Sequence, residues 1–395
     1  MKITLLQTSK DVHVYIKRNI RYSIKTDEIS KIAPSLGVKF EGTLEEEALK
    51  KSKDFGVFCY NQDKWAFIIG NKYSIFELLK ATKPKISKEL IKHITNFDKE
   101  HRYNISYNSK VLHLSDLRPL VMGVINLTED SFYASSRVSE KDILKKVEKM
   151  IEEGVDIIDL GPQSTRPGAE EISSHSEVSK LLEPLKTIRK EFKNIWISID
   201  TYFSNTARIC LEEGADIIND ISGGVFDEDM IRTIAIYNCP YIIGHSSYYK
   251  PKEWPKIDFE YEDITIDIIN HFKSQETKLL EFGYNLFNGI IIDPCIGFAK
   301  KPVHNLEILN EIEALRSLDK PILIGTSRKS FIGIVIKEFL QKKSIPSPEE
   351  RLIGSLGSIA QSIVKNACHI VRVHDVKETK EFIAMLDAIR NYHYA

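Results

Sequence analysis

From about residue 118 onwards, short apolar runs alternate with longer stretches in which apolar residues recur at helical spacing. Residues 139–154 and 175–192 are two of these amphipathic stretches, which are typical of helices that cover a sheet. Strands that are apolar along nearly their whole length are usually buried on both faces, as in parallel sheets. The number of such runs favours a (β/α)8 TIM barrel over an open sheet. The eight runs occupy residues 120–126, 156–161, 195–200, 216–220, 241–245, 289–294, 321–327 and 369–375.

The first part of the chain has a different pattern, which predicts a small α+β unit before the barrel. Residues 55–61 and 64–71 are rich in aromatic and β-branched side chains and are separated by a short polar turn, so they predict a β-hairpin. Residues 43–54 and 86–101 have the capping and periodicity of helices. We therefore expect two domains. The first, at 1–110, contains no chemical motif and its role is unknown; the second, at 111–395, is the barrel.

The distribution of charge agrees with this division. The chain has 395 residues, of which 42% are hydrophobic and 28% are charged, as is ordinary for a globular protein. Its net charge is −1, but residues 1–110 carry 21 Lys and Arg against 13 Asp and Glu. The basic first domain is consistent with an anionic partner, with a solvated lysine-rich surface, or with a face that docks on the acidic second domain.

Composition and missing motifs exclude several classes of protein. No stretch approaches the ~18 consecutive apolar residues of a membrane span, and the apolar run at the N-terminus is too short for a secretory signal. The five cysteines are scattered, which indicates reduced thiols in a cytoplasmic protein and no disulfide framework or zinc site. No G-x-G-x-x-G follows the first barrel strand, so a dinucleotide fold is not expected. We expect no membrane or nucleic-acid partner.

Polar side chains follow every expected barrel strand, at the end where such barrels carry their catalytic groups. Each has a structural interpretation when taken singly, because an Asp after a strand often caps a helix and an Asn often forms a turn. Together they form two sets. One set suits a polar heterocycle and consists of Asp200, Asn219, Asp293 and Lys329. The other suits a diphosphate with its Mg²⁺ and consists of Asn126, Arg372 and His374.

These residues lie within strings that closely resemble the signatures of the dihydropteroate synthase family, in the order in which that family has them. The resemblance covers roughly residues 116–390, and ordered motifs in this number are highly specific. It implies a pterin-binding TIM barrel that joins 6-hydroxymethyl-7,8-dihydropterin diphosphate to p-aminobenzoate, with release of pyrophosphate, in folate biosynthesis. The strings are "RPLVMGVINLTEDSF", "STRPGA", "SIDTY", "INDISGG", "IDPCIGFAK", "GTSRKSFIG" and "RVHDVKET".

The resemblance also implies roles for individual residues and a homodimer. The pterin ring would be held by Asp200, Asn219, Asp293 and Lys329. The diphosphate would be held by Asn126, Arg372 and His374, with Asn126 acting through Mg²⁺. Two loops would close over the site, and the catalytic side chains would be Asp130, Thr165, Arg166 and Lys329. The p-aminobenzoate slot, where sulfonamides would compete, would be lined by Phe132, Thr165, Pro167 and Ser330.

Several positions depart from the family pattern around motifs that otherwise match. The first loop has Glu129 in place of the usual proline, and the second has Pro162 and Gln163 before its Ser-Thr-Arg. Two family glycines are replaced by Cys295 and Ala299. The catalytic side chains are thus retained while loop hinges change.

A residue that would form one wall of the pterin site also changes, at the end of the fifth strand. Gly244 stands where the family tends to have a methionine that packs on the pterin. Tyr248 or Tyr249 could supply this wall, or could equally be surface residues. The exact arylamine and pterin therefore stay open.

Three other functions account for parts of the pattern. A synthase of a related archaeal-type pterin that uses another arylamine would keep every motif. A pterin-dependent methyltransferase shares the barrel and its carboxylates, but it has no diphosphate to bind and does not explain "STRPGA", "GTSRKS" and "RVHD". A non-catalytic pterin-binding protein would be indicated by loss of Asp130, Arg166 or Lys329, and all three are present.

Overall fold

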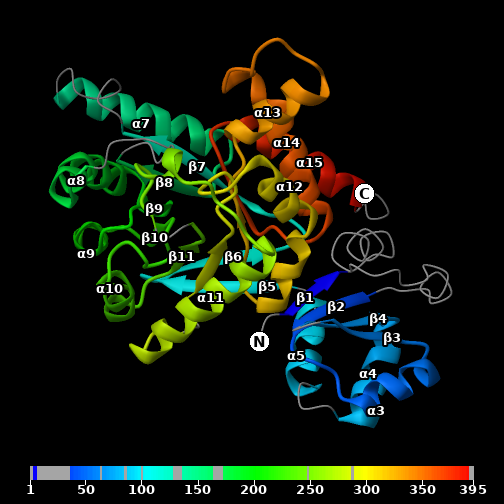
Figure 1. Ribbon diagram of the computed structural model, residues 1–395. Coiled ribbons are helices and arrows are strands. Elements are labelled where there is room, and N and C mark those ends of the chain that lie inside the picture. Colours follow the sequence, from blue (N-terminus) through cyan, green and yellow to red (C-terminus); the bar gives the residue numbers. More distant parts are fainter. Residues whose placement is uncertain are drawn as a thin grey trace. The chain divides into compact units, whose positions relative to one another are not determined.

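The chain forms two compact units, shown in Figure 1. The computed structural model describes residues 3–6, 36–62, 65–83, 87–98, 101–127, 136–162, 172–246, 249–285 and 289–390. The first unit combines Met1–Glu100 with two later segments, Asp263–Asn270 and Glu311–Asp319. The second unit contains His101–Glu262, His271–Asn310 and Lys320–Ala395. Among the described residues, no helix is long and apolar enough to cross a membrane.

The second unit is built around a closed barrel of parallel strands. Neighbouring strands pair in the order β12-β11-β10-β9-β8-β7-β14-β13. A parallel bridge between Ile292 and Ile322 joins β12 to the residues just before β13, and this bridge closes the ring. The predicted (β/α)8 fold is therefore confirmed. The strands are β7 (Leu120–Asn126), β8 (Ile157–Gly161), β9 (Trp196–Asp200), β10 (Ile217–Asp220), β11 (Tyr241–Gly244), β12 (Ile290–Asp293), β13 (Leu323–Ile324) and β14 (Ile370–Val373).

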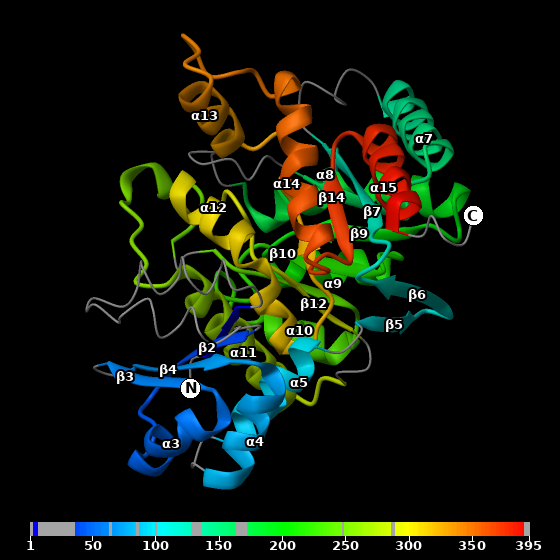
Figure 2. The same ribbon diagram turned by 90° about the vertical axis from the view of Figure 1, so that its right-hand side faces the viewer.

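Helices follow the strands along the chain, as Figures 1 and 2 show. The amphipathic stretches expected at 139–154 and 175–192 correspond to the first two of them. Their apolar residues face inward because burial of that stripe is what stabilises a helix against a sheet. The helices are α7 (Ser136–Glu152), α8 (Ser174–Glu191), α9 (Ser204–Glu212), α10 (Met230–Tyr237), α11 (Ile264–Glu281), α12 (Pro302–Asn310), α13 (Ser330–Phe339), α14 (Leu352–Val364) and α15 (Val376–Arg390).

A β-hairpin plugs the end of the barrel where the strands begin. It consists of β5 (Arg102–Tyr107) and β6 (Lys110–Ser115), joined by Asn108 and Ser109 with φ of 47° and 61°, as a two-residue hairpin turn requires. The hairpin was not predicted, and it spans residue 110, where the sequence suggested a domain boundary. Its apolar side chains form one buried cluster with early residues of the barrel strands: Ile105, Leu112, Leu114, Met122, Ile157, Trp196, Ile217, Ile242, Ile291, Leu323 and Ile370.

The first unit contains an antiparallel sheet with helices. Its strand order is β1-β2-β4-β3, and the pairing of β3 with β4 confirms the predicted hairpin. A buried cluster that includes Phe40, Ile68 and Leu78 forms its core. The elements are β1 (Ile3–Leu6), β2 (Leu36–Glu41), β3 (Phe58–Gln62), β4 (Trp65–Gly70), α3 (Glu46–Lys51), α4 (Lys72–Thr82), α5 (Ser87–Asp98) and the 3₁₀ helix η4 (Ile312–Leu318).

A buried ion pair holds one of the later segments in the first unit. Lys39 Nζ on β2 lies 3.1 Å from Asp263 Oδ2, and both side chains are less than a tenth exposed. The same ammonium group lies 4.5 Å from the centre of the Trp65 ring. Since a buried charge is costly unless it is paired, this contact specifies where the segment before α11 must lie in the unit.

Candidate active site

Buried charges converge where the barrel strands end. Arg372 on β14 lies between two carboxylates: its Nε is 2.6 Å from Asp159 Oδ2, and one terminal nitrogen is 2.6 Å from Asp200 Oδ2. Asn219 Nδ2 lies 3.4 Å from both oxygens of Asp159. The structure therefore brings together Asp200 and Asn219, expected on the pterin, with Arg372, expected on the diphosphate.

Asp159 completes this group and was not predicted as a site residue. It is the third residue of β8 and is fully buried. A carboxylate inside an apolar strand is costly unless a cation pairs with it. The second aspartate of "VDIIDLG" was the available signal, because it interrupts an otherwise apolar run.

Asp293 and Lys329 are the other two residues that were expected to hold the pterin. Asp293 Oδ1 accepts a hydrogen bond of 2.7 Å from the backbone N–H of Cys295. Lys329 Nζ donates to the carbonyl of Ile296 and lies 4.0 Å from the centre of the Phe298 ring. Both side chains therefore contact the loop that follows β12, and this loop links the carboxylate to the ammonium group.

Burial governs the protonation of these groups. It raises the pKa of Asp200 to about 7, against the opposing effect of Arg372. It also raises the pKa of Asp293, against the effect of Lys329. The pKa of Lys329 is lowered to about 8, again chiefly by burial. The site thus contains an acid, Asp200, and a base, Lys329, that change charge near neutral pH, as groups in functional sites often do.

The residues that were expected to hold the diphosphate lie at the same end of the barrel. Asn126 is the last residue of β7. His374 follows β14, and its Nδ1 lies 3.0 Å from Ser327 Oγ. Burial and the nearby Arg372 lower the pKa of His374 to about 4, so the imidazole is neutral at pH 7. Arg372 is therefore the cation of this set, while Asn126 and His374 offer neutral groups.

Most of the expected loop residues lie outside the described residues. These are Glu129, Asp130, Phe132, Gln163, Thr165, Arg166, Pro167 and Tyr248. Pro162 is described and is buried just after β8. Ser330, expected in the p-aminobenzoate slot, is the first residue of α13 and directly follows Lys329.

The loop after β12 keeps a glycine-like backbone at the two positions where glycine is replaced. Cys295 and Ala299 have φ of 49° and 50°, in the left-handed region that costs a residue with a side chain about 1–2 kcal/mol. Lys300 compensates, since its Nζ donates to the carbonyls of His245, Cys295 and Phe298 at 2.7, 3.3 and 3.1 Å. The left-handed backbone conformation therefore occurs at these two positions without glycine.

Gly244 is tightly enclosed by backbone. A Cβ at this position would lie 2.6 Å from the carbonyl oxygen of Asp220 and from backbone atoms of Ile221. The position therefore has no space for the methionine that the family tends to carry. The departure seen in the sequence is a requirement of this backbone.

Replacement of Gly244 by alanine is expected to lower the free energy of unfolding by about 1–3 kcal/mol, because overpacked side chains force the backbone to shift. Urea denaturation followed by circular dichroism would measure the change. Gly325→Ala is the matched control, since a Cβ there would meet only Arg372 Cβ, at an ordinary 3.7 Å. Equal effects of the two substitutions would contradict the crowding at Gly244.

Aromatic side chains near the site were missed by the sequence analysis. Trp254 is buried and its ring centre lies 5.7 Å from that of Phe298, which in turn faces Lys329. Tyr249, one candidate for the missing wall, is 50% exposed, and its carbonyl accepts a 2.6 Å hydrogen bond from Trp254 Nε1. Trp254 and Phe298 are thus better placed than Tyr249 to form an apolar wall beside Lys329.

The family model of pterin-binding enzymes matches residues 122–374, more than half of the chain, so the fold and the site define a pterin-binding barrel enzyme. The dihydropteroate synthase of Clostridium beijerinckii is 39% identical over 273 residues, which cover 69% of this chain and 94% of that protein. The chain belongs to the dihydropteroate synthase family, as the motifs predicted.

Two solved structures show the same relationship. A dihydropteroate synthase from Clostridium difficile, in the presence of pteroic acid, aligns with a TM-score of 0.61 and 33% identity over 69% of this chain and 97% of that chain. A Yersinia pestis dihydropteroate synthase with a sulfonamide drug complex aligns with a TM-score of 0.64 and 28% identity over 73% of this chain and 99% of that chain. The family model begins at residue 122, so the first unit's N-terminal part lies outside it.

Proposed function

We propose that this chain is an enzyme of folate biosynthesis that condenses 6-hydroxymethyl-7,8-dihydropterin diphosphate with p-aminobenzoate. The observation that supports this most directly is the convergence of Asp200, Asn219, Asp293 and Lys329 at one end of a barrel of this family. Adjacent N–H donors of a pterin match a buried carboxylate, which accepts more than one hydrogen bond. Asp293 is best placed for this role, because one of its oxygens is already fixed by Cys295.

The reaction exchanges one bond for another at the pterin methylene carbon. The C–O bond to the diphosphate breaks, its electron pair leaves with pyrophosphate, and the lone pair of the amine forms the C–N bond. One amine proton is then released. Where the C–O bond breaks first, the pterin methylene becomes cationic and must be shielded from water. Asp130 would stabilise that charge, and Thr165 and Arg166 would act on the departing diphosphate.

We assign diphosphate binding to Asn126, Arg372 and His374, with Mg²⁺ held at Asn126. An amide oxygen is a suitable ligand for this hard cation, and Arg372 supplies the cationic contact that a neutral His374 lacks. When bound, Mg²⁺ would neutralise charge on the leaving pyrophosphate. The p-aminobenzoate slot, which sulfonamides would share, would be formed by Phe132, Thr165, Pro167 and Ser330.

A direct assay tests the proposed function. Purified full-length protein is mixed with the pterin diphosphate, Mg²⁺ and p-aminobenzoate, and dihydropteroate is measured by chromatography. Omission of Mg²⁺ from the same assay tests the metal. No product with p-aminobenzoate but product with another arylamine would overturn the folate assignment. Methyl transfer to a corrinoid protein, without any condensation, would instead identify a pterin-dependent methyltransferase.

The rate of this reaction is expected to have a bell-shaped dependence on pH. Protonation of Asp200 removes an acceptor as pH falls below about 7, and deprotonation of Lys329 removes a donor as pH rises above about 8. Because kcat/KM reports on groups of the free enzyme, it should decline on both sides of this range. Lys329→Arg keeps the charge at high pH and should move the alkaline limb upward. An unchanged alkaline limb would show that another group is responsible.

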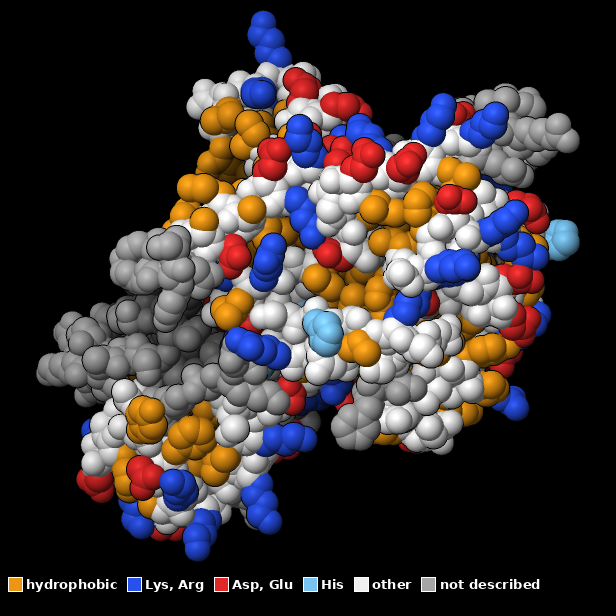
Figure 3. Space-filling model, turned by 180° about the vertical axis from the view of Figure 1, so that it is seen from behind, with side chains coloured by type: hydrophobic (Ala, Val, Ile, Leu, Met, Phe, Trp, Pro, Cys, Tyr) orange, Lys and Arg blue, Asp and Glu red, His pale blue; other side chains and the backbone are white. Residues whose placement is uncertain are grey.

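We also propose that the chain acts as a cytoplasmic homodimer. Hydrophobic side chains gather over α13 and α14, at the upper left of Figure 3. Phe339 and Ile353 on these helices are 80% and 85% exposed, and Leu340 between them is 67% exposed. Large exposed apolar patches mark interaction surfaces, and a second copy would cover this one. Sedimentation that finds only monomers would contradict the dimer.

A further inference from the structure

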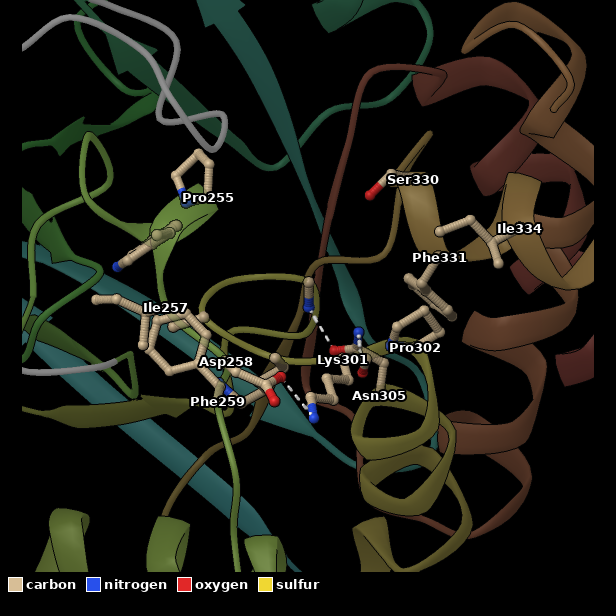
Figure 4. A pocket seen from close by; sticks show the side chains of 14 residues that line it. Pro255, Ile257, Asp258, Phe259, Lys301, Pro302, Asn305, Ser330, Phe331 and Ile334 are labelled. Atoms are coloured by element: carbon tan, nitrogen blue, oxygen red, sulfur yellow. Dashed lines mark hydrogen bonds and ion pairs between the residues drawn. The ribbon is translucent and has the colours of Figure 1, made fainter.

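A pocket of about 280 Å³ lies beside the loop after β12 (Figure 4). We call it the outer pocket. Three parts of the chain form its walls: the loop between β11 and α11, the loop after β12 with the start of α12, and the first turns of α13. The first contributes Trp254, Pro255, Ile257, Asp258 and Phe259, the second Gly297, Ala299, Lys300, Lys301, Pro302 and Asn305, and the third Ser330, Phe331 and Ile334.

The outer pocket begins where the contacts of Lys329 end. Ser330, which lines it, directly follows Lys329 in the chain, and Gly297, which also lines it, follows Ile296, whose carbonyl accepts from Lys329 Nζ. A Cβ on Gly297 would lie 2.7 Å from Lys329 Cδ. The loop after β12 therefore runs from Asp293, past the carbonyl that Lys329 contacts, to the outer pocket. A substrate whose pterin meets Asp293 and whose arylamine passes Lys329 would point its far end at this pocket.

The charged groups of the outer pocket are already occupied by the protein. Lys300 Nζ donates to three backbone carbonyls. Lys301 Nζ is 2.7 Å from Asp258 Oδ1 and also pairs with Glu260. Asn305 accepts from the N–H of Gly297 at 2.6 Å and donates to the carbonyl of Lys301 at 3.0 Å. An additional charged ligand would have to displace one of these contacts.

The remaining lining is aromatic and aliphatic. Phe259 and Ile257 face the pocket from one side, and Phe331 and Ile334 from the other, with Pro302 between them, as the labelled side chains in Figure 4 show. Surfaces of this kind bind flat or apolar groups through burial and van der Waals contact. Among the described residues that line the pocket, Ser330 supplies the hydroxyl, which can hydrogen-bond a carbonyl at the para position.

From this arrangement we infer that the outer pocket binds a substituent beyond the para-carbonyl of the arylamine. The substrate class thus extends to p-aminobenzoic amides whose amide nitrogen carries an uncharged aromatic or aliphatic group. The bond changes are those of the proposed condensation, because the substituent lies away from the reacting amine. This inference rests on the proposed function and names a second class of acceptor for the same site.

The experiment compares two amines, p-aminobenzoate and 4-aminobenzanilide, in the condensation assay with full-length protein. We expect both to give product, with kcat/KM for the anilide within about tenfold of that for p-aminobenzoate. Ile334→Trp, which fills the pocket, should lower the ratio of anilide to p-aminobenzoate kcat/KM at least tenfold. Ile334→Ala, which enlarges it, should raise that ratio, and it provides a test if the tryptophan variant fails to fold.

Val303→Trp is the matched control, because Val303 is a β-branched residue of α12 that is 60% exposed and does not line the pocket. It should leave the ratio unchanged. Product from p-aminobenzoate but none from the anilide would overturn the inference and leave the proposed function intact. A ratio that every folded Ile334 variant leaves unchanged would also overturn the inference and leave the proposed function intact. Product from neither amine would overturn the proposed function itself, and with it this inference.

Discussion

Replacement of Arg372 by methionine is expected to lower the free energy of unfolding by about 3–5 kcal/mol and to abolish dihydropteroate synthesis. The guanidinium group forms ion pairs with both Asp159 and Asp200. Removal of one partner of a buried pair leaves an uncompensated charge in a site of low dielectric, which accounts for the size of the expected effect. Denaturation by urea would give the stability, and the condensation assay would give the activity.

The double variant Arg372→Met with Asp159→Asn separates the two effects. The second substitution removes one of the two carboxylates that have lost their ion-pair partner. Part of the free energy of unfolding should therefore return, while synthesis stays absent. If the Arg372→Met variant has the same free energy of unfolding as the parent, Arg372 does not offset the cost of burying these carboxylates. Recovery of synthesis in the double variant would contradict the assignment of Arg372 to the diphosphate.

Replacement of Asp293 by asparagine is expected to weaken pterin binding by about 3–6 kcal/mol, or roughly 10²–10⁴-fold. Two hydrogen bonds to the charged carboxylate contribute about 1.5–3 kcal/mol each, and the amide places an N–H₂ group where the pterin presents donors. The fold should be retained, because the amide oxygen can still accept from the backbone N–H of Cys295. Calorimetric titration with the pterin diphosphate would measure the change.

Asp229→Asn is the matched control for this variant. Asp229 precedes α10, is exposed and makes no side-chain capping bond, so its substitution should leave pterin affinity unaltered. If the Asp293 variant binds the pterin as tightly as the parent, this carboxylate is not the group that accepts hydrogen bonds from the pterin. Asp200 would then be the remaining carboxylate of the predicted set.

The barrel could be predicted from sequence because each strand is buried on both faces. Such strands appear as apolar runs, and all eight expected runs contain a strand of the barrel. The hairpin formed by β5 and β6 escaped prediction because only one face of it is buried, in alternation, and its turn carries Asn-Ser instead of a glycine.

The candidate site was predictable to the extent that its chemistry resides in strand-end residues. Asp200, Asn219 and Asp293 stand at or next to the last position of their strands, where the barrel fold itself brings them together. Asp159 lies inside its strand, and its importance emerges only from the contact with Arg372, which comes from the other end of the domain's sequence. Trp254 and Phe298 were missed for the same reason, since only the fold places the two rings together.

The discontinuous make-up of the first unit has a consequence for the order of events during synthesis. Its buried cluster uses residues from Val38 to Ile94, but Lys39 pairs with Asp263, and the unit also includes Glu311–Asp319. At a ribosomal rate of about 5–20 residues per second, residue 319 follows residue 100 by roughly 10–40 s. Until residue 263 has been made, Lys39 has no Asp263 to pair with. The nascent unit must therefore stay soluble while Lys39 lacks its ion-pair partner. The unit is completed only after most of the barrel has been made.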